Sequence, residues 1–122
     1  MSYVDGFLLA VPKKKLGEYR TFARRAGRIW RHHGALQYVE AIGDDLQIAG
    51  VVSFTKRAAV KPGEVPVFSW IRYKSRADRD RVNARVMKDP RMLKMIAGMK
   101  DRPQPFDMKR MAYSGFTSIV EL

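Results

Sequence analysis

Two segments of the chain, Tyr3–Val11 and Val65–Tyr73, are apolar on both of their alternating faces. A strand in a sheet that is exposed to water on one side alternates apolar with polar residues, so these segments indicate a sheet that is buried on both sides. The helical patterns in the rest of the chain suffice to cover only one of these sides. We therefore expect the other side to pack against the sheet of a second copy of the chain.

The rest of the chain alternates between helical and extended patterns. The expected elements are a helix from Pro12 to His33, a strand over Ala35–Ile42, a short helical piece at Phe54–Ala59 in the long connection Leu46–Pro66, helices from Ser75 to Lys88 and from Asp89 onward, and a last strand over Met108–Val120. With right-handed crossovers this order predicts one α+β domain over residues 1–122, a ferredoxin-like βαββαβ protomer with an antiparallel four-stranded sheet. The two apolar strands lie in its centre.

Two of the expected helices begin with recognisable capping residues. Ser75 and Asp78 have the spacing of a capping box, in which the serine accepts a hydrogen bond from a backbone N–H and the carboxylate reaches back. Asp89 followed by Pro90 matches an N-cap carboxylate with proline at the first helical position. These signals predict a pair of helices after the second apolar strand.

The chain is strongly basic. It has 24 lysine and arginine residues against 12 aspartate and glutamate residues, a net charge of +12 at pH 7, and a pI near 10.4. Such an excess attracts polyanions, so nonspecific nucleic-acid binding is one interpretation. The favoured interpretation is a solvated basic surface, because net charge governs association and solubility rather than fold. A basic stripe lies opposite the apolar face of the first helix and consists of Arg20, Arg24, Arg28 and Arg31.

Several classes of functional site lack their residues. The chain has no cysteine and therefore no disulfide, cysteine metal site or thiol nucleophile. Its two histidines, His32 and His33, are adjacent on a helix and point about 100° apart, so we expect no metal site. There is no glycine-rich phosphate loop or nucleophile elbow, and we expect no cofactor. No apolar run approaches the ~20 residues of a membrane span, so we expect a cytoplasmic protein without a membrane partner.

Short blocks along nearly the whole chain resemble a known family. The blocks are Tyr3–Phe7, Val67–Ile71, Asp89–Met92, Pro105–Asp107 and Lys109–Tyr113. In this order they are similar to the YbaA-like family of small bacterial proteins, a family of unknown function among the dimeric α+β barrels. The resemblance implies a ferredoxin-like protomer whose sheet packs against the sheet of its twin, and it implies no established activity.

Asp5 is the charged residue that most needs an explanation. It lies within an apolar strand on the same side as Phe7 and Leu9, and a buried carboxylate needs a cation or several hydrogen-bond donors. We expect Arg110 or Arg72, on the strands to either side, to supply them. The favoured interpretation is a paired charge that fixes the strand register or the dimer.

The alternative interpretation of Asp5 is an anion- or proton-handling site in the barrel cleft. The residues predicted to bind a ligand there are Asp5, Phe68, Trp70, Arg72, Arg110 and Tyr113. No residue pattern identifies the ligand or a reaction, and we predict no catalytic residue.

Three functional hypotheses agree with these patterns. The favoured one is a homodimer that binds a small molecule in a cleft between sheet and helices, with the further option of a cofactor-independent enzyme. Other dimeric α+β barrels include cofactor-free monooxygenases and isomerases, which is an analogy at the level of fold. The second hypothesis is nonspecific binding of nucleic acid or another polyanion through the basic surface. The third is a dimer that serves only as an interaction scaffold.

Overall fold

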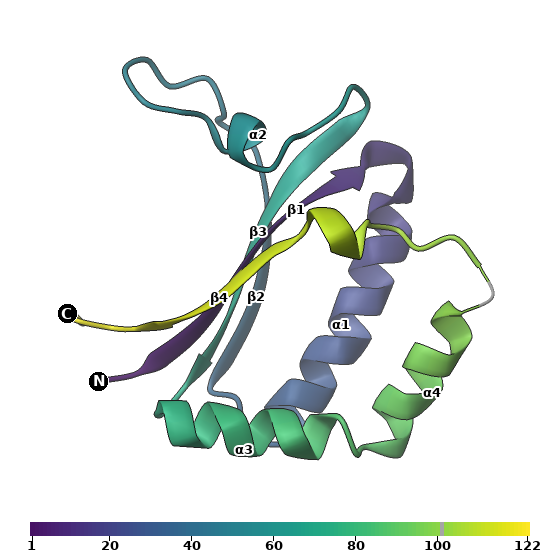
Figure 1. The fold of residues 1–122 in the computed structure, drawn as a ribbon, viewed down its shortest axis with the longest axis vertical. Helices are drawn as coiled ribbons and strands as arrows, with labels where there is room; N and C mark the ends of the chain where they lie inside the picture. The colour runs from purple at the N-terminus through teal and green to yellow at the C-terminus, as the bar shows by residue number, and fades with distance from the viewer. Residues whose placement is uncertain (101) are drawn as a thin grey trace.

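The computed structural model describes residues 1–100 and 102–122 of the chain (Figure 1). Its strands are β1 (Tyr3–Pro12), β2 (Gln37–Ile42), β3 (Glu64–Tyr73) and β4 (Ala112–Thr117), and its helices are α1 (Leu16–His32), α2 (Phe54–Arg57), α3 (Arg76–Val86) and α4 (Pro90–Met99). Two short 3-10 turns, η1 (Lys13–Lys15) and η2 (Met108–Arg110), precede α1 and β4. The order of the elements agrees with the predicted order.

The four strands form one antiparallel sheet in the order β2-β3-β1-β4. The two doubly apolar strands, β1 and β3, therefore lie in its centre, and their register pairs Tyr3 with Tyr73 and Leu9 with Val67. Figure 1 shows α1, α3 and α4 on one side of this sheet. This arrangement is the ferredoxin-like α+β fold and confirms the predicted fold class.

The core lies between the sheet and the helices and consists of two clusters. The first joins β3 to α1, α3 and α4 through Ala26, Ile29, Ala35, Ile71, Tyr73, Val82, Val86 and Met92. The second joins β1 and β3 to the first half of α1 through Leu9, Val11, Tyr19, Ala23 and Val67. The residues that β1 and β3 contribute all have odd numbers. The odd-numbered residues of these strands therefore face the helices.

The opposite face of the sheet, which we call the open face, is also apolar. Its large apolar side chains are Val4, Leu8, Val39, Phe68, Trp70 and Phe116. Phe68 and Phe116 are 43% and 58% exposed. Helices α1, α3 and α4 thus cover one face of the sheet, as the pattern of the central strands predicts. They leave the opposite apolar face largely open, and Phe54 of the short helix α2 packs against Phe68 there.

Both predicted helix caps are present. Ser75 Oγ accepts a hydrogen bond from the backbone N–H of Asp78 at 3.1 Å, and Asp89 Oδ1 accepts one from the backbone N–H of Arg91 at 2.8 Å. The Asp78 carboxylate accepts a hydrogen bond from Arg81 Nη2 at 3.1 Å. The capping box therefore forms in its first half, while its carboxylate pairs along the helix.

The last strand is shorter than the predicted Met108–Val120. Asp107 accepts a hydrogen bond from the backbone N–H of Lys109 at 3.0 Å, and this cap holds residues 108–110 in the η2 turn. Beyond β4 the chain still runs beside the N-terminus, where the backbone N–H of Ser118 donates to the carbonyl of Ser2 at 3.0 Å.

Gly27 allows α1 to approach the edge strand β2 closely. A Cβ atom at this position would lie 2.6 Å from Cδ1 and 2.8 Å from Cε1 of Tyr38. These distances are too short for carbon atoms in contact, so only glycine lets the Tyr38 ring lie against the helix backbone here. Gly17 provides a contrast in the same helix, because a Cβ atom there would meet nothing within 4 Å.

We expect Gly27→Ala to destabilise the protein, although alanine favours a helix over glycine by about 1 kcal/mol. The added methyl group must displace the Tyr38 ring, and overpacking of this kind costs about 1–3 kcal/mol. Gly17→Ala is the matched control, since it improves helix propensity without a clash and should not lower the Tm. Thermal unfolding followed by circular dichroism measures both. A Gly27→Ala variant as stable as Gly17→Ala would contradict the close approach.

Candidate functional site

The structure divides the six residues predicted to bind a ligand among three places. Asp5 and Tyr113 face the helices. Phe68, Trp70 and Arg72 lie on the open face, and Arg110 lies in η2. The structure therefore brings Asp5 together with Tyr113 on one side of the sheet, and Phe68 together with Trp70 on the other.

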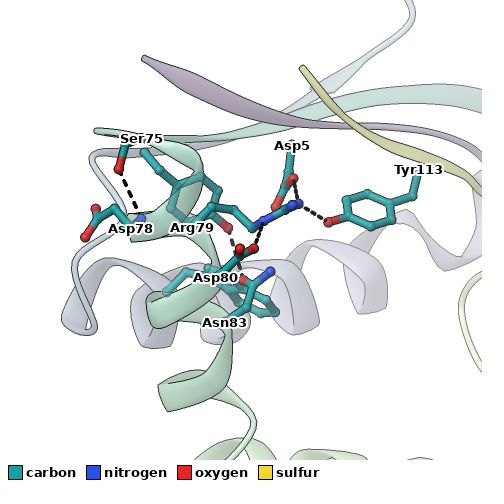
Figure 2. A network of polar contacts seen from close by, with 9 residues as sticks. Asp5, Ser75, Asp78, Arg79, Asp80, Asn83 and Tyr113 are labelled. Atoms are coloured by element: carbon teal, nitrogen blue, oxygen red, sulfur yellow. Dashed lines mark hydrogen bonds and ion pairs between the residues drawn. The ribbon is translucent and has the colours of Figure 1, made fainter. Parts of the chain in front are cut away.

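Asp5 is paired with a cation, and that cation is Arg79 of α3 (Figure 2). Arg79 Nη1 donates to Asp5 Oδ1 at 2.7 Å and to the Tyr113 hydroxyl at 3.0 Å, while Arg79 Nε donates to Asp80 Oδ1 at 2.8 Å. The guanidinium also lies over the ring of Tyr3, 4.9 Å from its centroid. The side chains of Asp5 and Arg79 are 2% and 13% exposed, so the ion pair is buried.

This network shifts the pKa values of its members. Burial lowers the pKa of Arg79, but the hydrogen bond to Asp80 and the charge of Asp5 outweigh it and hold that pKa above its ordinary value. Burial is the larger cause and the charge of Asp5 the next largest, and both raise the pKa of Tyr73 and of Tyr113. At neutral pH both phenols therefore keep their protons, and Arg79 keeps its charge.

The prediction that Arg72 or Arg110 pairs with Asp5 is wrong. Arg72 lies opposite Val4 in the register of β1 and β3, which places it on the open face. Arg110 lies in η2, where its guanidinium donates to both carboxylate oxygens of Glu64, at 2.7 and 3.0 Å. These hydrogen bonds lower the pKa of Glu64 to about 2. Arg79 was not among the predicted partners because the prediction considered only the strands beside Asp5, whereas Arg79 lies in the helix layer.

Phe68 and Trp70 lie on the far side of the sheet from Asp5. Phe68 packs against Phe54 of α2 and against Trp70, with ring centroids 5.7 and 5.6 Å apart. Trp70 Nε1 donates to Gln37 Oε1 at 3.1 Å. The expectation that these rings wall the Asp5 site is therefore wrong. The geometry around Asp5 agrees with a paired charge that fixes α3 on the sheet.

The two histidines have different surroundings. His33 Nε2 lies 2.7 Å from Asp89 Oδ2, whereas His32 is exposed. Hydrogen bonds from Arg91 and His33 hold the pKa of Asp89 below its ordinary value. Over residues 1–100 and 102–122, no three histidine, aspartate or glutamate side chains gather closely enough to hold a metal ion. Over the same ranges, no helix has both the length and the apolar character needed to cross a membrane.

A groove of about 720 Å³ lies between α1 and the β2 edge of the sheet, and we call it the α1–β2 groove. Its apolar lining includes Leu16, Ala23, Ile42 and Val67. Ile42 points to the helix side of the sheet but is 53% exposed, because α1 does not cover the end of the edge strand. Gly27 also lines the groove and brings the helix against β2 there.

Glu40 is the polar centre of the α1–β2 groove. The Tyr19 hydroxyl donates to Glu40 Oε1 at 2.6 Å, and the Tyr38 hydroxyl donates to Oε2 at 2.8 Å. Burial is the larger cause and the charge of Glu40 the next largest, and both raise the pKa of the two tyrosines. Each carboxylate oxygen therefore keeps a phenol donor at neutral pH and still has a lone pair to accept a hydrogen bond from a ligand.

The α1–β2 groove is rimmed by the basic stripe of α1, namely Arg20, Arg24, Arg28 and Arg31. Arg31 Nη1 donates to the carbonyl of Ala35 at 3.1 Å. In the part of the chain that the structure describes, the other three arginines have no ion-pair partner. The stripe is recognisable in the sequence, but the groove beside it is not, because the groove depends on where β2 lies.

A second groove, of about 680 Å³, lies on the other side of α1, between that helix and α4, and we call it the α1–α4 groove. Its cations are Arg25, Arg28, Arg91, Lys94 and Arg102. Arg24 and Arg25 are adjacent in the sequence, yet Arg24 lines the α1–β2 groove and Arg25 lines the α1–α4 groove. This difference provides a matched pair of positions for mutagenesis.

We expect Asp5→Ala to destabilise the protein, because it leaves the Arg79 guanidinium buried without its carboxylate. Breaking a buried ion pair costs about 3–5 kcal/mol. In double-mutant cycles followed by urea denaturation, Asp5→Ala and Arg79→Ala should couple by more than about 1 kcal/mol. Asp5→Ala and Arg72→Ala should show almost no coupling, since Arg72 lies on the other face of the sheet. Stronger coupling to Arg72 than to Arg79 would show that the assigned pairing is incorrect.

Solved structures that share this fold include an oxygenase and a ferredoxin-like protein. SnoaB, a cofactor-independent oxygenase from Streptomyces nogalater, superposes with a TM-score of 0.58 at 12% identity, covering 99% of this chain and 96% of that one. A dimeric ferredoxin-like protein from an uncultured marine organism superposes with a TM-score of 0.57 at 12% identity, covering 100% of both chains. At these identities the likeness concerns the fold alone.

Two sequence comparisons identify the family. The uncharacterized protein YbaA of Escherichia coli K12 is 41% identical over 121 residues, which cover 99% of each chain. The family described as "Protein of unknown function (DUF1428)" matches residues 2–108. The chain therefore belongs to the DUF1428 family, and the resemblance of its sequence blocks to YbaA-like proteins is confirmed.

Proposed function

We propose that this protein is a homodimer that binds a small molecule in the α1–β2 groove of each protomer. The observation that carries this proposal is the groove itself, in which apolar side chains surround a carboxylate held between Tyr19 and Tyr38. Small-molecule sites are typically concave and mostly apolar, have a few well-placed polar groups and enclose about 300–1,000 Å³. The α1–β2 groove, at about 720 Å³, has this character.

The open face supports the dimer. Phe68 and Phe116 are half exposed there among other apolar side chains, and a contiguous apolar surface of this kind marks an interaction site. A two-fold axis would bring the same surface of a second copy against it. The marine protein of similar fold is described as dimeric, which supports the same arrangement by analogy.

A cofactor-independent enzyme is the second candidate function. The description of SnoaB as a cofactor-independent oxygenase raises it by analogy of fold, and Glu40 offers a chemical group for it. A carboxylate in a partly apolar groove can take a proton from a bound molecule. The hydroxyls of Tyr19 and Tyr38 each donate their single proton to Glu40 and so hold its carboxylate in a fixed orientation for this role. The alternatives of nucleic-acid binding and a pure scaffold depend on the net charge and on the open face alone.

We expect the wild-type protein to sediment as a dimer at micromolar concentration and the double variant Phe68→Glu/Phe116→Glu to sediment as a monomer. The glutamates would bury unpaired charges in an apolar interface, which is strongly unfavourable. Met87→Glu is the control, because Met87 is 48% exposed at the end of α3, on the helix side. Analytical ultracentrifugation distinguishes these states. A wild-type protein that is monomeric and folded would rule out the dimer.

We expect the uncharged fluorescent probe N-phenyl-1-naphthylamine to bind in the α1–β2 groove. Ile42→Asp should weaken this binding about tenfold or more, because burying an apolar side chain of this size contributes about 1.5–3 kcal/mol. Leu93→Asp is the matched control, since Leu93 of α4 is 52% exposed, Ile42 is 53% exposed, and only Ile42 lines this groove. Fluorescence titration measures each Kd. Equal losses in the two variants would disprove the assignment of the groove.

A further inference from the structure

We infer that the ligand of the α1–β2 groove is an amphipathic organic anion, with an apolar body and one anionic group. This inference depends on the proposed function, because it names the class of molecule that the same groove binds. It follows from the way apolar side chains, arginines and one carboxylate are distributed along the groove.

The direction of α1 relative to β2 gives the groove two different ends. Tyr19, near the start of the helix, bonds to Glu40, and Gly27, nearer its end, lies against Tyr38. The helix therefore runs antiparallel to the strand. The start of α1 and the end of β2 form one end of the groove, and the end of α1 and the start of β2 form the other.

The first end is mainly apolar and the second is cationic. Leu16 and Ile42 lie at the first end, where Ile42 is half exposed and Arg20, one helical turn after Leu16, is the nearest arginine. Arg28 and Arg31 lie at the second end, and Arg24 lies one helical turn nearer the middle. At a rise of 1.5 Å per residue, Leu16 and Arg24 are about 12 Å apart along the helix axis. A molecule that lies along the groove thus contacts apolar side chains first and guanidinium groups second.

The guanidinium groups at the cationic end of the groove favour binding of an anion. Arg24 and Arg28 are four residues apart on one face of α1, where like charges repel each other. Within the described ranges, neither has an ion-pair partner. A carboxylate, sulfonate or phosphate group matches the planar donors of arginine and accepts charge-assisted hydrogen bonds from them. A ligand with such a group would remove the repulsion.

Glu40 and the apolar end restrict the class further. The Glu40 carboxylate repels a second negative charge beside it, so the anionic group of the ligand is directed toward the arginines. A small inorganic anion would leave Leu16 and Ile42 in water, and an uncharged apolar molecule would leave the arginines without a counter-ion. An amphipathic anion satisfies both ends of the groove at once.

The experiment uses two fluorescent probes that differ by one charged group. They are 1-anilinonaphthalene-8-sulfonate and N-phenyl-1-naphthylamine, which has the same ring system without the sulfonate. We expect Arg24→Glu to raise the Kd of the sulfonate probe about tenfold, because a charge-assisted contact becomes a repulsion. The Kd of the uncharged probe should change by less than about twofold, since its contacts are apolar.

Arg25→Glu is the matched control, because it makes the same change in net charge one residue away, on the α1–α4 groove. It should leave both Kd values within about threefold of the wild type, as expected for a screened charge outside the site. Arg24→Gln removes the charge without reversing it and should give an intermediate loss of sulfonate binding. Circular dichroism confirms that each variant is folded.

The outcomes separate this inference from the proposed function. If Ile42→Asp weakens the uncharged probe but Arg24→Glu leaves the sulfonate probe unaffected, the groove binds small molecules and the inference of an anion is wrong. If Arg25→Glu weakens the sulfonate probe as much as Arg24→Glu, the effect comes from net charge, and the inference is also wrong. If neither probe responds to Ile42→Asp, the groove is not the site, and the proposed function fails with the inference.

Discussion

The apolar character of β1 and β3 on both of their faces is the constraint on which the rest of this structure depends. On one side the odd-numbered residues meet the helices in two apolar clusters. On the other side the even-numbered residues form the open face, which α1, α3 and α4 leave uncovered and which α2 contacts where Phe54 packs against Phe68. The same constraint explains the network around Asp5. A carboxylate in a strand beneath the helices must be neutralised from the helix layer, and Arg79 of α3 supplies the charge.

Local patterns in the sequence predict the fold well and the contacts between layers poorly. Apolar segments of period two and the caps at Ser75 and Asp89 depend only on residues that are close in the sequence, so they can be predicted from it. The structure confirms both. The burial of Asp5 can be predicted for the same reason. The partner of Asp5 cannot be predicted in this way, because a shift of one residue in strand register moves Arg72 to the other face of the sheet. The sequence also does not reveal which residue of α3 reaches β1.

In the candidate site, too, the local pattern can be predicted from the sequence and the contacts between elements cannot. The arginine stripe on α1 is visible at steps of three and four residues, but a helix face does not reveal what lies beside it. The groove exists because β2 approaches α1 at Gly27, and a glycine inside a helical pattern was the one available sign of such a contact. Tyr19, Tyr38 and Glu40 come from two elements that only the folded chain brings together. Their arrangement therefore cannot be predicted from any single segment of the sequence.

The charge of the protein is unevenly divided between its two layers. The four strands carry three carboxylates, Asp5, Glu40 and Glu64, and one arginine, Arg72, whereas α1 alone carries five arginines and one glutamate. Because Asp5 and Glu64 are neutralised by Arg79 and Arg110, two protomers joined through their sheets would form a particle with a nearly neutral waist and two cationic poles. Its contacts with polyanions would then be made at the poles, while pairing at the waist would be nearly insensitive to salt. In such a particle, adhesion to other molecules and self-assembly respond to different solution conditions.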